Sequence, residues 1–153
     1  NMKNGLPHGK GTMKIKGGEF NGTWKNGIPQ KGTLVKKYGV YTGNLKNGVP
    51  NGRGTYESSS AILNGNWKGG KMHGKGKEIK KSTHAQSGYV QYNGNWKNGK
   101  MHGTGNYQRL ISGAFYSGQF KNGKQHGIGV GRKRNSEPVL DGRWENGKYI
   151  GPA

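Results

Sequence analysis

Residues 92–107 read YNGNWKNGKMHGTGNY, and the spacing of aromatic residues, glycines and asparagines in this stretch predicts the fold. Side chains on a strand alternate between two faces, so Tyr92 and Trp96 share one face with a glycine between them. The following Asn-Gly supplies residues that tolerate positive φ and predicts a tight reversal. The chain then returns and brings Tyr107 to the same aromatic face. The stretch therefore predicts one β-hairpin of about 15 residues, with glycine leaving room for a ring to lie across the backbone.

The same phrase recurs along the whole chain at steps of 21 to 29 residues. All four tryptophans occupy one position of the phrase: Trp24, Trp67, Trp96 and Trp144. Self-similarity at this spacing indicates a repeat array. We expect one array over residues 1–153, with repeats at about 1–13, 20–34, 41–56, 63–78, 92–107, 116–131 and 140–153 and an insertion at about 80–89.

The composition indicates a thin core. Only 27% of residues are hydrophobic and the net charge is +20, values that are typical of disordered chains. The apolar residues nevertheless keep fixed repeat positions, which favours order. There is too little apolar surface for two packed layers. We therefore predict an all-β fold, an elongated single-layer twisted antiparallel sheet of consecutive hairpins. The chain has no cysteine and thus no disulfide or thiolate metal site.

The pattern Tyr-x-Gly-x-Trp-x-x-Gly-x-x-His-Gly-x-Gly-x-Tyr resembles the MORN repeat, and residues 92–107 match every marked position. Other copies depart locally, with Asn51 in place of His and Glu78 in place of Tyr. The resemblance implies a non-catalytic scaffold that binds proteins, in a cytoplasmic, cytoskeletal or ciliary setting. It also implies two alternatives, attachment to anionic phospholipid such as phosphoinositide, or an accessory role beside the catalytic domain of a larger enzyme. The array begins and ends within a repeat, so we expect a longer protein.

No residue pattern predicts a catalytic, cofactor-binding or metal site. Four histidines recur before a glycine, but equivalent positions on alternate strands lie roughly 10 Å apart, which suits structural turn residues better than metal ligands. Residues 69–75 match the start of a phosphate-binding loop, yet Gly76 follows where Ser or Thr is needed. The six acidic residues do not recur as a pair.

The face opposite the rings is basic. Lysine follows the tryptophan position in most repeats, and by alternation these lysines form a row that points away from the rings. These lysines could simply keep an exposed sheet soluble. Alternatively, they could bind an anion or a lipid surface. The candidate residues are Lys25, Lys46, Lys68, Lys97 and Lys121, with a separate cluster of Arg132, Lys133 and Arg134.

The aromatic face is the second candidate surface, because a one-layer sheet leaves part of it uncovered and exposed apolar patches mark interaction sites. The alternative is that the rings cover one another as the core, which we favour for Trp96. The candidate partner groove comprises Tyr41, Trp67, Tyr92, Trp96, Tyr107, Tyr116 and Phe120.

Protein binding ranks first among the hypotheses, with a helix or extended peptide lying in this groove. Anionic membrane lipid ranks second. Nucleic acid is least favoured, because base stacking needs rings and cations on one surface. Homodimerisation through the end strands is a further option.

Overall fold

The computed structural model describes residues 1–81 and 89–153, and within them every regular element is a β-strand. The strand bounds are β1 Met2–Lys3, β2 Leu6–Pro7, β3 Gly9–Ile15, β4 Gly18–Lys25, β5 Ile28–Lys36, β6 Gly39–Lys46, β7 Val49–Glu57, β8 Ala61–Lys68, β9 Lys71–Lys80, β10 Val90–Lys97, β11 Lys100–Arg109, β12 Phe115–Lys121, β13 Lys124–Arg132, β14 Leu140–Glu145 and β15 Lys148–Gly151.

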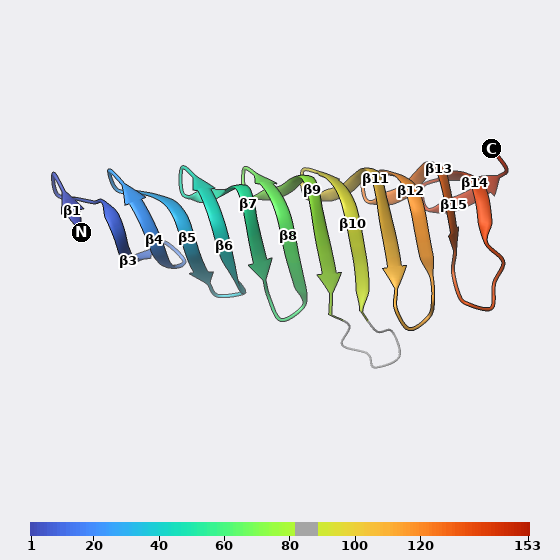
Figure 1. Cartoon of the computed structure of the whole chain (residues 1–153), viewed down its shortest axis with the longest axis horizontal. Coiled ribbons are helices and arrows are strands. Elements are labelled where there is room, and N and C mark those ends of the chain that lie inside the picture. The colour runs from blue at the N-terminus through green and yellow to red at the C-terminus, as the bar shows by residue number, and fades with distance from the viewer. Residues whose placement is uncertain (82–88) are drawn as a thin grey trace.

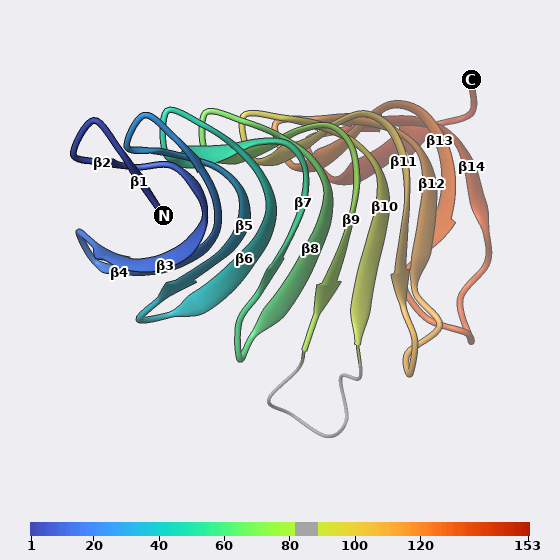
Figure 2. The same cartoon turned by 60° about the vertical axis from the view of Figure 1, so that its left-hand side comes forward.

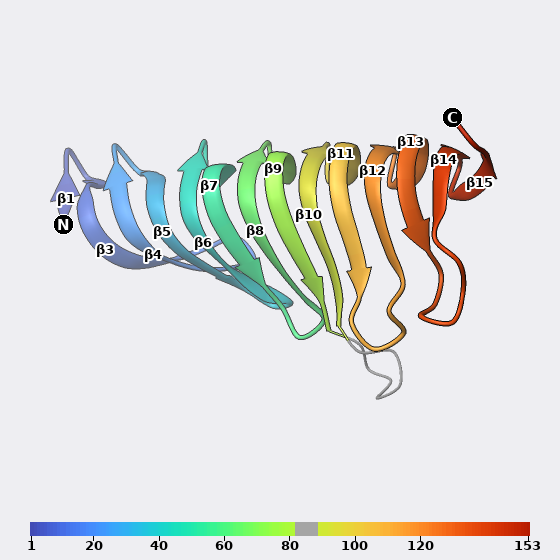
Figure 3. The same ribbon diagram turned by 45° about the vertical axis from the view of Figure 1, so that its right-hand side comes forward.

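The strands follow one another in sequence order along a single open sheet. Strands β3 to β15 form a 13-stranded antiparallel sheet in which each strand pairs with its chain neighbours, and β1 and β2 pair separately at the N-terminal end. Figure 1 shows the hairpins side by side from the N-terminus to the C-terminus, and Figure 3 shows that no second layer covers them. The predicted all-β, single-layer, antiparallel fold is confirmed.

Asn-Gly pairs close the hairpins, as predicted. Asn98 and Gly99 have φ of 49° and 81°, and five other asparagines that precede a turn glycine have φ between 48° and 51°. Two residues with positive φ match the twist of the flanking strands. These reversals all lie along one edge of the sheet, which we call the turn edge. The opposite edge carries the connections between hairpins and is the loop edge (Figure 1).

A line of paired glycines crosses the sheet from β3 to β14, and we call it the glycine seam. Its members pair in strand order: Gly11, Gly22, Gly32, Gly43, Gly54, Gly65, Gly76, Gly94, Gly105, Gly118, Gly129 and Gly142. A Cβ added at Gly94 would collide with Gly105 Cα and lie 2.6 Å from Thr104 O. One added at Gly105 would overlap the Tyr92 ring. Glycine is therefore required where rings lie across the backbone, as predicted.

The sheet curves because each hairpin contains a bulge directly beyond the seam. In the β10–β11 pair, Gly94 faces Gly105 but Trp96 faces Met101, so the return strand carries extra residues. Gly103 occupies the bulge with φ of 77°, a conformation that suits glycine. Bulges bend and twist a strand. Their repetition curves the whole sheet into an open trough (Figure 2).

The aromatic residues lie on the inner face of this trough. Tyr92 and Trp96 are four residues apart, roughly 13 Å along an extended strand. Their ring centroids nevertheless lie only 5.0 Å apart. Side chains on the outside of a bend would diverge, so these converging rings mark the inside. The other face, which carries the polar residues between them, is the outer face.

The predicted insertion lies mostly outside the described residues. Strand β9 ends at Lys80 and β10 begins at Val90, and His84 is among the residues that the structure does not describe. The hairpins β4–β5 and β14–β15 are present where the sequence predicts repeats at 20–34 and 140–153.

Candidate functional site

Most residues of the predicted partner groove form the core of the trough. Tyr41, Trp67, Tyr92, Trp96, Tyr116 and Phe120 are buried and Tyr107 is half-buried. Trp96 is 6% exposed although no second layer covers it. The rings bury one another, so these residues hold the sheet together, and their role in binding a partner stays a prediction.

The rings form a ladder of edge-to-face contacts that joins successive repeats. The Tyr92 ring contacts Trp96 of its own strand and Phe120 of the next repeat, both at 5.0 Å between centroids. Tyr116 contacts Trp144 of the following repeat at 5.1 Å. Each edge-to-face pair adds about 0.5–1.5 kcal/mol beyond area burial. These contacts therefore couple the repeat at 41–56 to the one at 63–78, and the last three repeats to one another.

Every tryptophan anchors its polar atom in the same way. Nε1 of Trp96 donates a hydrogen bond to the backbone oxygen of Gly76 at 2.9 Å, and Trp24, Trp67 and Trp144 donate to the seam glycines Gly11, Gly54 and Gly129 at 2.9–3.0 Å. A buried indole N–H needs such a partner. The tryptophan position is thus fixed by packing and by hydrogen bonding together.

Three tyrosines donate their hydroxyl hydrogen to a backbone oxygen three residues later on the same strand: Tyr41 to Asn44, Tyr92 to Asn95 and Tyr116 to Gln119, at 2.7–2.8 Å. Burial raises the pKa of Tyr41 and Tyr92 to about 12 and also raises the pKa of Tyr116. The core accordingly favours the neutral phenol, since a buried phenolate would lose its hydration.

These shifts predict alkaline unfolding. A raised folded-state pKa gives stability that is complete below the ordinary tyrosine value of about 10 and is lost as the pH rises through the folded value. In an absorbance titration of tyrosinate, Tyr41, Tyr92 and Tyr116 should ionise above the ordinary tyrosine pKa, together with loss of the β circular dichroism signal. Ionisation of these three tyrosines near the ordinary pKa in a folded chain would contradict the assignment.

One apolar groove on the inner face stays open beside the buried rings. It crosses β5 to β8, encloses about 330 Å³, and we call it the central groove. Its lining is mainly apolar, with one lysine at its rim. The lining side chains are Leu34, Lys36, Tyr41, Pro50, Tyr56, Leu63 and Trp67.

Glu78 stands next to the central groove in the row otherwise occupied by apolar side chains. It pairs in register with Leu63 on one side and with Tyr92 on the other. Burial raises its pKa, and Lys80, 3.9 Å away, opposes the rise. The departure from tyrosine noted in the sequence thus places a half-buried acid inside the trough.

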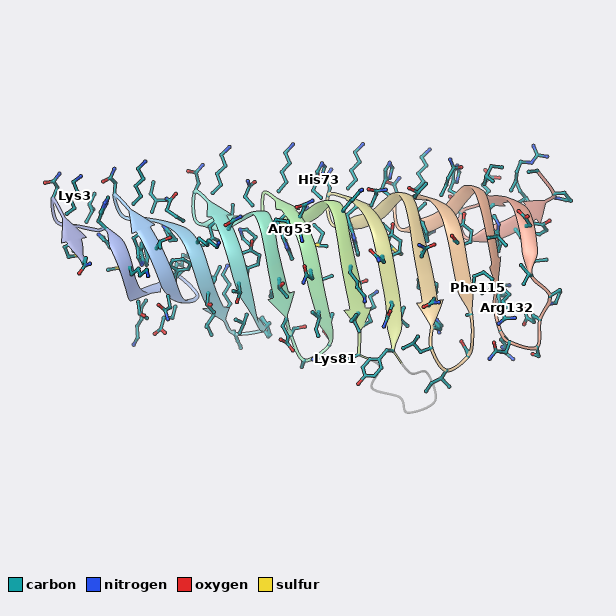
Figure 4. All side chains as sticks on the ribbon, in the orientation of Figure 1. Lys3, Arg53, His73, Lys81, Phe115 and Arg132 are labelled. Carbon is teal, nitrogen blue, oxygen red and sulfur yellow. The ribbon has the colours of Figure 1, made fainter. Side chains whose placement is uncertain are left out.

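The recurring histidines have a structural role, but in strands rather than in turns. His73 and His102 lie in β9 and β11 beside the bulge glycines. Nδ1 of His73 accepts a hydrogen bond from Asn98 N in the turn of the next repeat at 3.4 Å, and His102 makes the same contact with Asn122. His73 appears near the turn edge in Figure 4. The sequence predicted that these histidines lie in turns, and this is wrong: they lie in strands. The glycine that follows each one occupies a bulge and not a turn.

In the described part of the chain, no three His, Asp or Glu side chains gather into a group that could hold a metal ion. Residues 69–75, which resemble a phosphate-binding loop, form the turn between β8 and β9 and the start of β9. The described residues also contain no helix long and apolar enough to cross a membrane.

The predicted lysine row is exposed and lies along the turn edge. Lys25, Lys46, Lys68, Lys97 and Lys121 are the last residues of their strands before the turns. Figure 4 shows long side chains projecting beyond this edge, with Lys3 labelled at its N-terminal end. The row is thus concentrated on one rim of the sheet.

Three lysines of this row face a second lysine across the turn, and this second column was not predicted from the sequence. Lys68 pairs with Lys71, Lys97 with Lys100 and Lys121 with Lys124. The two-residue turn alone would have revealed these pairs, because it places the residues before and after it opposite each other. The doubled column raises the charge density of the turn edge.

These pairs predict that replacing lysines of the row with glutamate leaves the chain folded. Like charges directly opposite each other destabilise a sheet, by about 0.2–1 kcal/mol per pair. Lys68→Glu and Lys97→Glu should each raise the melting temperature slightly, whereas Lys46→Glu, which faces Val49, should leave it unchanged. The triple variant should lose binding to a soluble polyanion. Unfolding of that variant would show that the row is not solvent-facing.

The cluster Arg132, Lys133 and Arg134 does not join the lysine row. It lies at the loop edge, where Figure 4 labels Arg132 near Phe115. The structure brings it together with Arg109 of β11 around a second pocket. Arg109 was not predicted as a site residue; it lies near the cluster because β11 and β13 pair with opposite sides of β12.

The comparison with family models agrees with the hairpin geometry. A family model described as MORN repeat matches residues 1–19, 41–60, 64–82, 92–109 and 116–130, together more than half of the chain. The chain belongs to the MORN repeat family. MORN repeats are non-catalytic interaction modules. A comparison with curated proteins finds no significant match. The MORN array also contains the hairpins β4–β5 and β14–β15, to which the family model was not matched.

Proposed function

We propose that this MORN array is a scaffold that binds a protein partner in the central groove. The observation that carries the proposal is an open apolar groove in an inner face where most of the other large rings are buried. Leu63 and Tyr56 are only half-buried there, so apolar surface remains for a partner to cover. Apolar concave surfaces with a few polar groups at the rim are typical binding sites.

The charge around the groove defines the partner. The chain carries a net charge of +20. Lys36 lines the loop-edge end of the groove, and Gly70, in a turn of the lysine-rich turn edge, lines the other end. An amphipathic helix or extended peptide with an apolar face and acidic flanks complements this surface, since opposite potentials steer association and fix orientation. The partner proposal rests on this combination of apolar lining and basic rim.

We place the scaffold in the cytoplasm, in a cytoskeletal or ciliary assembly. This setting is supported by the family resemblance.

Peptide selection tests the proposal. Peptides selected on the chain from a random library should bind through the groove, so Leu63→Glu should weaken them by at least about tenfold. Val40→Glu is the matched control: it adds the same charge on neighbouring β6, but Val40 is exposed on the outer face. Circular dichroism should show both variants folded. Equal loss of binding in both, or in neither, would reject the groove.

Attachment to an anionic membrane surface is the second candidate, favoured by the doubled lysine column of the turn edge. Each lysine close to a charged leaflet contributes about 1 kcal/mol, and the effect falls off within a Debye length. Flotation with anionic vesicles, and its loss in the Lys46, Lys68 and Lys97 triple variant, tests this candidate separately from the groove.

A further inference from the structure

A second pocket lies near the C-terminal end of the sheet, over β11 to β13. It extends from the loop edge to Gln125 near the turn edge and shares no lining residue with the central groove. Two connections build it, residues 110–114 between β11 and β12 and residues 133–139 between β13 and β14. It encloses about 410 Å³. Its charged lining consists of Arg109, Arg132, Lys133 and Arg134.

Hydrogen bonds fix the two connections against each other. Asn135 N donates to Ser112 O at 3.0 Å, which ties one loop to the other. Arg132 donates through Nε to Gly113 O at 3.2 Å and through Nη2 to Asn135 Oδ1 at 2.8 Å. Gly113 has φ of 67°, and any Cβ there would overlap the Asn135 side chain. The pocket walls are therefore preorganised.

Aromatic residues orient two of the guanidinium groups. Arg109 donates from Nε to the Tyr107 hydroxyl at 2.8 Å. Arg132 lies over the Phe115 ring, 5.5 Å from its centroid, as Figure 4 illustrates. Arg109 is anchored through Nε alone, which leaves its two terminal nitrogens available, whereas Arg132 is anchored through both Nε and Nη2. Guanidinium forks bind phosphate oxygens in pairs.

Among the described residues no carboxylate lines the pocket, although Glu137 follows in the same connection and its backbone N–H donates to Arg134 O at 3.1 Å. The ion pairs found in the described part of the chain involve Lys80 and Lys81. Four positive groups held around one cavity repel one another, and an anion with several charges would relieve that repulsion. Arg109, Lys133 and Arg134 are exposed, as the lysines of the turn edge are, but they surround one cavity whose loops are tied together through the half-buried Arg132.

We propose that this pocket binds a multiply phosphorylated small group, either free in solution or as the head group of a lipid. Arg109, Lys133 and Arg134 contact the phosphates, and Arg132 positions the two loops that carry them. The cavity accommodates a phosphorylated ring of sugar size, with Phe115 and Tyr107 supporting the arginines. The site is independent of peptide binding in the central groove.

Calorimetric titration with inositol trisphosphate at near-physiological salt tests the site. The chain should bind with one-to-one stoichiometry, and an Arg109→Gln, Arg134→Gln variant should bind at least about tenfold more weakly. The matched control, Lys14→Gln with Lys16→Gln, removes the same charge at exposed positions by the end of β3, at the opposite end of the sheet, and should change affinity less than about twofold. Equal weakening of both variants would show diffuse charge attraction and overturn the proposal. Absence of binding to the unmodified chain would overturn it as well.

A competition experiment with vesicles shows whether the phosphorylated group belongs to a lipid or to a soluble molecule. Neutral phosphatidylcholine vesicles that contain phosphatidylinositol bisphosphate should compete with the free ligand if the pocket reaches a membrane surface. Competition that depends on Arg109 and Arg134 assigns the site to lipid, whereas retained binding of the free ligand without competition assigns it to a soluble phosphate ester. Vesicle binding that the Arg109 and Arg134 variant retains in full would contradict a role of the pocket in lipid binding.

Discussion

Replacing Trp96 with alanine is expected to lower the free energy of unfolding by about 3–5 kcal/mol, the usual effect of truncating a large buried ring. The Trp96 side chain is 6% exposed, packs edge-to-face with Tyr92 and donates to Gly76 O. Its removal would leave both the ring ladder and that backbone oxygen without their partner. Urea denaturation followed by circular dichroism measures the loss.

Tyr38→Ala is the matched control for that variant. Tyr38 is 75% exposed and stacks only with the Lys37 ammonium group, so its truncation should change stability by less than about 0.5 kcal/mol. If Trp96→Ala left the unfolding curve unchanged, Trp96 would belong to a binding surface rather than to the core. The comparison therefore decides between the two interpretations of the aromatic face.

Gly94→Ala is expected to destabilise the sheet by about 3 kcal/mol, the upper part of the range for overpacking. The new methyl group would collide with Gly105 Cα and with Thr104 O at 2.6 Å. These are backbone atoms of the paired strand, which can move only if the ladder between β10 and β11 opens. Urea denaturation is again the measurement.

The seam supplies its own control in Gly11→Ala. Gly11 occupies the same register position on β3, yet an added Cβ would meet only Asn1 N, at 3.9 Å. That variant should unfold within about 0.5 kcal/mol of the unmodified chain. Equal tolerance of alanine at both positions would show that close approach of the strands does not explain the seam.

The hairpins could be predicted because each one is encoded locally. The alternation around Trp96, the Asn-Gly turn and the recurrence of both along the chain specify strand, reversal and array without any long-range information. The low content of hydrophobic residues correctly predicted a thin core in a single layer. The use of glycine beneath rings also followed, since no other residue leaves that space.

The curvature could not be predicted, because the bulge depends on how two strands pair. The His-Gly phrase looks like a turn signal, and only the register around Gly103 shows that it lies within a strand. The extent of the open groove depends on which rings lean over their neighbours. Arg109 lies near Arg132 because β11 and β13 pair with opposite sides of β12, a placement that depends on strand register.

The sequence indicated an aromatic face and a basic face, and binding at either one stays a prediction. On the aromatic face most rings are buried, and an open apolar groove remains around Leu63 and Tyr56. Three of the five lysines in the row face a second lysine across the turn, which pairing in register shows and the row alone does not.

Methyl nuclear magnetic resonance of the chain with a library-selected peptide tests the docking of a partner in the central groove most directly. Leu34 and Leu63 line the groove, whereas Val35 and Val40 are exposed on the outer face of the same region of sheet. The account predicts intermolecular contacts between the peptide and the methyl groups of Leu34 and Leu63, with those of Val35 and Val40 unaffected. Contacts with the two valines and none with the two leucines would place the partner on the outer face and contradict it.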